Sequence, residues 1–397
     1  MGCFMNIKGF KFAAVEAAIK KPGRLDLALI YTEQPAGVAA VFTTNKVKAA
    51  PVLLDEERVK GGSVQALVVN SGNANACTGG QGMADALETA RLVAADLQIP
   101  EDAVLVASTG VIGHFLPMDR MRGALPKLVA ECGNSTLNDI AAAIMTTDTF
   151  PKMVSRSGFA GGVAYNIAGV AKGSGMIMPN MATMLAFIVT DAAVDPSFLQ
   201  DCFRSANDFS FNAITVDGDT STNDTSLIMA NGAAGNQPIC SGTPDAEVFV
   251  EILNELLLSL AKLIVKDGEG ATKFVTINVV GAVSDAEAKQ AAMAVANSSL
   301  VKTAFFGQDA NWGRIFAAVG YSGIEVEQLK TDLYFDDVQM VKDGLFVGGD
   351  AEVRGTVVLK KPEFSVTVNL NLGSGAAAVY TSDLSYEYVK INADYRT

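Results

Sequence analysis

Residues Ala171–Ala192 read AKGSGMIMPNMATMLAFIVTDA and combine a glycine-containing loop, a turn and an apolar strand. Pro179 and Asn180 form the turn signal, and small Ala182 precedes Thr183, which opens the apolar run. A tight turn here can present the Thr183 hydroxyl to the carbonyl carbon of Ala182, giving an ester that water opens to release a new amino terminus. On the local sequence alone, the simpler interpretation is that Thr183 is an ordinary β-branched residue starting a strand.

Apolar spacing outside this stretch predicts helices and strands in mixed order. Apolar residues recur at intervals of three and four over 83–97, and a Pro-Asp pair opens an apolar-faced run over 244–266, so both segments are predicted helices. Strict alternation over 364–372 predicts a strand with one exposed face. Continuous apolar runs, typical of strands buried on both faces, occupy 64–69, 104–107 and 185–189.

These elements follow no regular βαβ order and no fixed period, which favours a layered α+β sandwich. A smaller C-terminal unit is predicted to begin near Phe274, without a Pro- or Ser-rich linker to mark the boundary. At 397 residues and 49% apolar composition, the chain can bury a large core.

The formal net charge of −13 would repel nucleic-acid phosphates, so we expect no nucleic-acid partner. No apolar stretch approaches about 18 residues, and we therefore expect no membrane span and a cytoplasmic location. The five cysteines are odd in number and widely spaced, which predicts free, mostly buried thiols.

The chain contains a single histidine, His114, and this restricts its chemistry. A two-histidine zinc motif is excluded, no GxSxG elbow or phosphate-binding loop is present, and we expect no metal and no bound cofactor. We expect His114 to be a neutral packing or surface residue. An acyl-transferring enzyme of this composition needs another base, and an N-terminal amine, which titrates at about 7.7 to 8.0, can serve a threonine at its own chain end.

Six further stretches strengthen the interpretation of Ala171–Ala192. They are NSGNAN (70–75), ASTGVIG (107–113), MTTDT (145–149), DGDTSTND (217–224), DGEGATK (267–273) and NWGR (311–314). Together with the KGxGM…PNMATML pattern, these segments resemble in order those of the ornithine acetyltransferases, the bifunctional glutamate N-acetyltransferases of arginine biosynthesis. The resemblance runs from about Gly9 to Thr397.

The resemblance implies a role for each matched residue. Thr183 would be the nucleophile, freed by self-cleavage of the Ala182–Thr183 bond, and Thr109 and Gly110 would stabilise the oxyanion of the tetrahedral intermediate. Lys172 could pair with a substrate carboxylate and Glu269 with an amino group. The implied substrate-binding residues are Thr146, Lys172, Thr183, Glu269, Asn392 and Thr397, and the motif does not decide between Thr146 and Thr147.

The implied fold is an N-terminal-nucleophile-like α/β/β/α sandwich with a smaller C-terminal domain. Cleavage would give an alpha chain, 1–182, and a beta chain, 183–397, which includes the region from about 274; two of each would form a heterotetramer. The implied reaction moves acetyl from N-acetylornithine to glutamate, and acetyl-CoA is a second possible donor. Two alternatives stay open: a self-processing amidase or aminopeptidase, and a non-catalytic amino-acid-binding protein.

Overall fold

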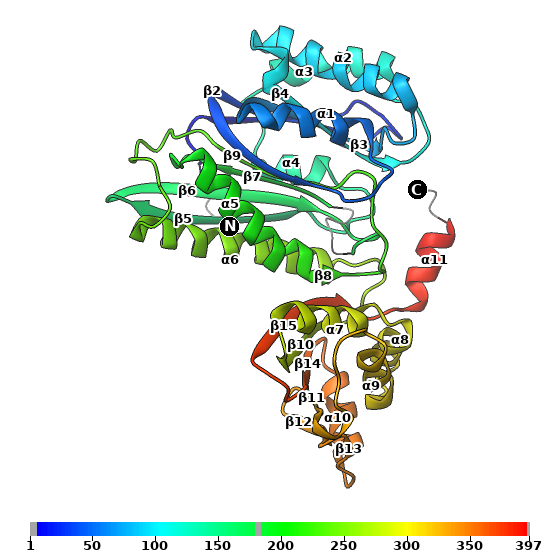
Figure 1. Ribbon diagram of the computed structural model, residues 1–397. Coiled ribbons are helices and arrows are strands. Elements are labelled where there is room, and N and C mark those ends of the chain that lie inside the picture. The colour runs from blue at the N-terminus through cyan, green and yellow to red at the C-terminus, as the bar shows by residue number, and fades with distance from the viewer. Residues whose placement is uncertain (1–5, 179–183, 395–397) are drawn as a thin grey trace.

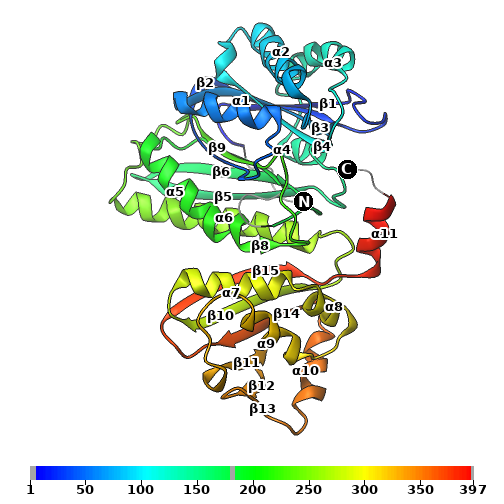
Figure 2. The ribbon, with the colours of Figure 1, turned by 45° about the vertical axis from the view of Figure 1, so that its right-hand side comes forward.

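The computed structural model describes residues 6–178 and 184–394 and contains two mixed β-sheets, each with its own helices (Figures 1 and 2). The eight-stranded sheet has the order β4-β3-β2-β9-β7-β6-β5, with β1 paired to β2. Its strands are β1 (Phe10–Val15), β2 (Leu27–Phe42), β3 (Ser63–Asn73), β4 (Val104–Val111), β5 (Lys152–Ala160), β6 (Val163–Lys172), β7 (Leu185–Thr190) and β9 (Thr225–Ala230).

Helices cover both faces of this sheet, so its central strands are buried on both sides. In β7, Phe187 and Val189 face one apolar cluster, whereas Ala186 and Ile188 face another. This two-sided burial explains the continuous apolar run at 185–189. The helices are α1 (Ala50–Arg58), α2 (Gly79–Leu97), α3 (Met118–Ala130), α4 (Leu137–Ala143), α5 (Pro196–Phe209) and α6 (Pro244–Lys266).

The seven-stranded sheet has the order β13-β12-β11-β14-β10-β15-β8 and forms the lower part of the molecule in Figure 1. Its strands are β8 (Ile214–Thr215), β10 (Phe274–Ala282), β11 (Asp332–Phe335), β12 (Val338–Lys342), β13 (Leu345–Phe346), β14 (Glu363–Asn369) and β15 (Gly375–Ser382). Its helices are α7 (Asp285–Asn297), α8 (Ser299–Gly307), α9 (Trp312–Gly320) and α10 (Ala351–Leu359). The two sheets with their helices confirm the predicted α+β class with a smaller C-terminal domain.

The last described helix, α11 (Tyr386–Asp394), leaves the C-terminal part and returns to the side of the upper part (Figures 1 and 2). Ser385, just before it, donates through its hydroxyl to the carbonyl of Gly270 at 2.6 Å. The backbone at Gly270 has φ +67°, and a Cβ there would lie 2.6 Å from the amide nitrogen of Tyr388. Glycine at this position therefore allows the helix to approach closely.

Several sequence expectations need correction or refinement. The alternating strand at 364–372 ends earlier, at Asn369, because Asn371 adopts a left-handed φ of 52° and turns the chain. The described cysteines are free, as expected, but they are not mostly buried, since Cys77 and Cys240 are exposed and only Cys202 is fully buried. No helix among residues 6–178 and 184–394 is long and apolar enough to cross a membrane.

Candidate active site

One cavity of about 220 Å³ gathers residues that lie far apart in the sequence, from Ala74 to Asn392. It lies where the ends of β3, β4 and β6 meet the loop before β9 and the helix α11. Its walls combine cationic, anionic and hydroxyl groups, which suits a small polar ligand. The lining residues are Ala74, Thr109, Gly110, Ile112, Thr146, Thr147, Lys172, Gly175, Met176, Asp217, Asp219, Ser221, Thr222, Asn223, Glu269, Tyr388 and Asn392.

Six residues predicted for the site line this cavity: Thr109, Gly110, Thr146, Lys172, Glu269 and Asn392. The alternative Thr147 lines it as well, so the structure does not separate the two threonines. The predicted cleavage site, Ala182 and Thr183, and the predicted substrate contact Thr397 lie outside the described residues. The structure therefore brings the described candidates together, and their individual roles stay predictions.

Thr109 and Gly110 lie near the end of β4, in close contact with β3. Gly110 has φ +136°, and a Cβ there would lie 2.3 Å from the carbonyl carbon of Gly72 and 2.5 Å from the amide nitrogen of Asn73. A side chain cannot fit, so glycine is required by both the backbone conformation and the space. Glycine therefore allows β4 to approach β3 closely beside the cavity.

A buried amide joins this turn to the start of β9. Asn223 donates through Nδ2 to the carbonyl oxygens of Ala74, at 2.6 Å, and Ser108, at 2.8 Å. The next residue, Asp224, is fully buried, and its Oδ1 accepts the backbone N–H of Met184 at 2.9 Å. The residue directly after the predicted nucleophile is therefore hydrogen-bonded to the same segment that holds the end of β4.

Burial raises the pKa of Asp224 well above its usual range, although the Met184 N–H and the charge of Lys172 act in the opposite direction. Burial likewise raises the pKa of Asp217. Asp217 accepts the backbone N–H groups of Met176, at 2.6 Å, and Ile177, at 2.8 Å. These two carboxyl groups thus hold the chain on both sides of the predicted cleavage site.

Glu269 lines the cavity and contacts α11. Its Oε2 accepts Asn392 Nδ2 at 2.8 Å, and its backbone N–H donates to Ser174 O at 2.9 Å. A Cβ on Gly175 would lie 2.3 to 2.7 Å from the Glu269 carboxylate atoms, so glycine leaves the space that this carboxylate occupies. The tyrosine one helical turn earlier, Tyr388, donates through its hydroxyl to Asp217 Oδ2 at 3.2 Å.

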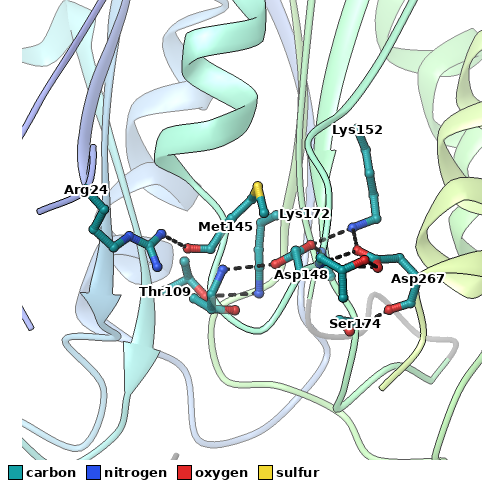
Figure 3. Close-up of polar contacts among 11 residues, drawn as sticks. Arg24, Thr109, Met145, Asp148, Lys152, Lys172, Ser174 and Asp267 are labelled. Carbon is teal, nitrogen blue, oxygen red and sulfur yellow. Dashed lines mark hydrogen bonds and ion pairs between the residues drawn. The ribbon is translucent and has the colours of Figure 1, made fainter. Parts of the chain in front are cut away.

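Lys172 enters the cavity from the end of β6, beside a group of buried charges (Figure 3). Its Nζ donates to Thr109 Oγ1 at 3.5 Å, and Figure 3 shows Asp148 between Lys172 and Lys152. Lys152 Nζ lies 2.7 Å from Asp148 Oδ1 and also pairs with Asp267. All four charged side chains are buried, which is costly unless their charges compensate one another.

Sequence reasoning did not select several of these polar residues. Asp148, Asp217, Asn223 and Asp224 lie inside the MTTDT and DGDTSTND stretches that carry the resemblance, so position in a matched motif was the available signal. Tyr388 lies in no quoted motif and shows no such signal. His114 is exposed and lies outside the lining of the cavity. Among residues 6–178 and 184–394, no group of three or more His, Cys, Asp or Glu side chains could hold a metal ion.

Comparison with known proteins gives full-length matches. The model of the ArgJ family matches residues 11–397. The arginine biosynthesis bifunctional protein ArgJ of Geobacter sulfurreducens is 72% identical over 393 residues, which covers 99% of this chain and 100% of that protein. The protein of the same name from Syntrophotalea carbinolica is 54% identical over 394 residues, again covering 99% and 100%.

A solved structure also matches part of the chain. The crystal structure of the arginine biosynthesis bifunctional protein ArgJ from Bacillus halodurans is 43% identical, with a TM-score of 0.50. The match covers 52% of this chain and 96% of that chain. The solved chain is thus about half as long as this one.

Proposed function

The chain belongs to the ArgJ family, and from this membership we propose that it transfers acetyl groups to glutamate in arginine biosynthesis through a covalent acetyl-Thr183 intermediate. The observation that carries the proposal is that Thr109, Gly110, Lys172 and Glu269 line one and the same cavity. Met184, which follows the proposed nucleophile, is hydrogen-bonded to a residue adjoining this cavity.

The nucleophile is first released by self-cleavage. The Thr183 hydroxyl oxygen attacks the carbonyl carbon of Ala182, the peptide C–N bond breaks, and an ester forms with a free Thr183 amine. Water then hydrolyses the ester, leaving a carboxylate on Ala182. The half-length chain of the Bacillus halodurans relative has the size expected after a cleavage near the middle. The products would be the alpha chain, 1–182, and the beta chain, 183–397, and we propose that two of each assemble.

Acetyl transfer then takes place in two steps. The Thr183 amine accepts the hydroxyl proton while Thr183 Oγ attacks the acetyl carbonyl carbon of N-acetylornithine. The amide C–N bond breaks, and the ornithine amine leaves with that proton. The glutamate amine next attacks the acetyl ester, the C–O bond breaks, and Thr183 Oγ recovers a proton. Thr109 and Gly110 lie at the cavity wall where they can donate to the oxyanion of each tetrahedral intermediate.

Charge complementarity supports an amino-acid substrate of this kind. Glu269, Asp217 and Asp219 form an acidic part of the cavity, which suits the amino groups of an ornithine derivative. Lys172 supplies the cation, on the side of Thr109. Thr146, Asn392 and Thr397 are proposed to orient the substrate. Parallel Thr146→Val and Thr147→Val variants test the first of these roles: the contacting threonine is the one whose loss raises KM.

The decisive test of the nucleophile is intact mass. Two fragments that meet between Ala182 and Thr183 are expected, and Thr183→Ala should remain one chain without transferase activity. Thr303→Ala is the matched control, because Thr303 is exposed on α8 and should leave cleavage and turnover unchanged. A single, fully active 397-residue chain would overturn the proposal.

The acceptor and the donor need separate experiments. Incubation with N-acetylornithine, with and without glutamate, distinguishes the transferase from a self-processing amidase or aminopeptidase, because acetate release that ignores glutamate identifies a hydrolase. Binding of the amino acid without processing or turnover would instead identify a non-catalytic binding protein.

Since the similar relatives are named bifunctional, we also propose that acetyl-CoA donates acetyl to the same threonine. No bound cofactor is required, and we propose a cytoplasmic location for the enzyme.

A further inference from the structure

The environment of Lys172 differs from what a substrate-binding lysine alone requires. Its side chain is 3% exposed, and its Nζ makes one hydrogen bond among the described residues, to Thr109 Oγ1 at 3.5 Å. Among the described residues, no group accepts a hydrogen bond from the Thr109 hydroxyl. The oxygen of Thr109 is therefore occupied by an ammonium donor, while its proton is available to a ligand in the cavity. Such contacts are often long in the empty site and shorten when substrate binds.

Asp148 occupies the centre of the charge group behind Lys172 (Figure 3). Its Oδ2 accepts the backbone N–H of Thr146 at 3.0 Å, and its Oδ1 accepts the backbone N–H of Gly173 at 2.7 Å. Its carboxylate also pairs with Lys152 at 2.7 Å. One buried carboxylate thus connects the segment of Thr146 with the residue that follows Lys172.

The charges are balanced in a way that keeps Asp148 ionised. Burial alone would raise the pKa of Asp148, but the cations Lys172 and Lys152 outweigh it and lower the pKa to about 2. Asp267 provides the second carboxylate for Lys152 and accepts the N–H and hydroxyl of Thr149. Two buried lysines therefore face two buried aspartates.

The charge of Lys172 depends on this arrangement. Burial lowers the pKa of Lys172, and Asp148 is the largest influence that raises it again. Lys152 acts with burial and lowers the pKa of Lys172, whereas Asp224 and Glu269 raise it. Of these charges, Asp148 is the one whose loss would most favour the neutral amine, which holds its hydrogen-bond partner less strongly.

From this geometry we infer that Lys172 and Asp148 are positioning residues for Thr109: the ammonium of Lys172 donates to the Thr109 oxygen and directs its hydroxyl proton toward the oxyanion. The inference rests on the proposed function, in which Thr109 is an oxyanion donor. A hydroxyl that accepts from a cation becomes a stronger donor, since linked hydrogen bonds polarise one another. Lys172 would then act mainly on the transition state, and its loss would lower kcat more than it raises KM.

A double-mutant cycle tests this connection. Thr109→Val should lower kcat for acetyl transfer about 100-fold, as expected for one lost oxyanion donor. Lys172→Met should lower kcat about tenfold, with KM for N-acetylornithine changed less than about threefold. Because both act through one hydroxyl, the double variant should resemble Thr109→Val, at about 100-fold, rather than reach the roughly 1,000-fold of independent effects.

The outcomes separate this inference from the proposed function. Independent effects of the two substitutions, or a Lys172→Met variant that raises KM at least about tenfold with unchanged kcat, would assign Lys172 to a substrate carboxylate and overturn the inference. Full activity of Thr109→Val would instead contradict the oxyanion role and with it the proposed mechanism. Intact mass and circular dichroism establish that each variant is cleaved and folded before its kinetics are compared.

Asp148→Asn provides a second measurement if Lys172→Met does not fold. Protonated Lys172 is the active form, so kcat should fall as pH rises through its pKa. Removal of the Asp148 charge should move this alkaline limb to lower pH, whereas the acidic limb, set by the Thr183 amine, should stay in place. Asp55→Asn is the matched control, because Asp55 is also buried and accepts the backbone N–H of Val106 in β4. An unchanged alkaline limb in Asp148→Asn, or an equal shift in Asp55→Asn, would refute the role of Asp148.

Discussion

Two buried lysines, one against each sheet, differ in their hydrogen-bond partners. Lys172 at the end of β6 and Lys302 on α8 are each 3% exposed. Lys302 is well supplied with neutral partners, since its Nζ donates to Thr381 Oγ1 at 2.8 Å and to the carbonyl of Ser382. Lys172 has one distant hydroxyl partner among the described residues and faces a cavity.

The charged groups around the two lysines differ as well. Burial lowers the pKa of Lys302 to about 7, and Asp383 and Asp217 act in the opposite direction. Lys172 instead faces Asp148, which belongs to a balanced group of four charges. A buried amine that only packs can become neutral, whereas a buried amine that must act on a ligand needs a carboxylate to stay charged.

The seven-stranded sheet and α11 nevertheless support the site from two directions. Thr215, in β8 of the seven-stranded sheet, donates to Ile177 O at 3.0 Å, and Val216 N–H donates to the same carbonyl at 2.8 Å. From the other direction, α11 supplies Tyr388 and Asn392. The two parts of the molecule therefore differ in role. The eight-stranded sheet with its helices, the first region, carries the charged groups of the site. The seven-stranded sheet with its helices and α11, the second region, holds the segments around them.

The largest effect that tests this division should come from Gly110→Ala in the first region. The added methyl would lie within 2.3 to 2.7 Å of backbone atoms of Gly72 and Asn73, which cannot move without separating β3 from β4. We expect kcat/KM for acetyl transfer to fall by at least about 100-fold, the range for a lost oxyanion donor. Steady-state kinetics measures this loss of kcat/KM, once thermal unfolding has established that the variant is folded.

Gly113→Ala is the matched control for Gly110→Ala. Gly113 also has a positive φ, +83°, but no atom lies within 4 Å of a Cβ placed there. It therefore carries only the cost of the backbone conformation, of order 1 kcal/mol, and should retain most activity. Equal losses in both variants would show that backbone strain, rather than the contact with β3, controls the turn.

A smaller effect is expected from removing α11, the contribution of the second region to the cavity. A chain that ends at Ser385 loses the Asn392 contact to Glu269, the Tyr388 contact to Asp217 and, with them, the proposed substrate contact Thr397. We expect KM for N-acetylornithine to rise about tenfold to 100-fold, as for two or more lost polar contacts at the cavity, while the protein stays folded. Kinetics and thermal unfolding together measure this outcome.

Val389→Ala on the same helix is the control, because this side chain is 63% exposed and should have no effect on KM. Unchanged kinetics in the truncated chain would confine the site to the first region. A loss of folded protein would instead show that α11 stabilises the molecule, and Asn392→Ala would then be needed to measure its effect on substrate.

Much of the fold could be predicted from sequence periodicity. The helices over 83–97 and 244–266 correspond to α2 and α6, and the apolar run at 185–189 corresponds to β7. Periodicity is informative there because each element has apolar residues facing a core. The early end of β14 could not be predicted, since the left-handed turn at Asn371 breaks a pattern that continues to Leu372.

The candidate site was predictable only through matched motifs. A lone lysine or glutamate carries no local signal of burial, so Lys172 and Glu269 depended on the stretches around them. Asp148 was not selected because its contact with Gly173, unlike its local contacts with Thr146 and Lys152, forms only when separate segments of the chain meet. Tertiary convergence of this kind leaves no periodic trace in the sequence.

A third prediction concerns Lys302 and changes stability rather than catalysis. Its pKa in the folded protein, about 7, lies below the value of 10.5 expected when unfolded. Between these values the unfolded chain binds a proton that the folded protein does not, so the free energy of unfolding should fall by up to about 1.4 kcal/mol for each unit of decreasing pH. Lys302→Met should remove this part of the slope, measured by urea unfolding between pH 7 and 10. Identical slopes in both proteins would show that Lys302 keeps its charge on folding.

The smallest effect is expected from Tyr388→Phe, which removes one hydroxyl and leaves the rest of α11 in place. That hydroxyl donates to Asp217 Oδ2 at 3.2 Å, and the same carboxylate holds Met176 and Ile177, so its loss loosens the helix and the loop together. One such hydrogen bond contributes about 1 kcal/mol, which corresponds to a rise in KM of about fivefold. Tyr386→Phe, at a residue that is 82% exposed, is the matched control and should leave KM unchanged. A fall in kcat without a change in KM would mean that the second region reaches the chemistry itself, and the division of roles between the two sheets would then fail.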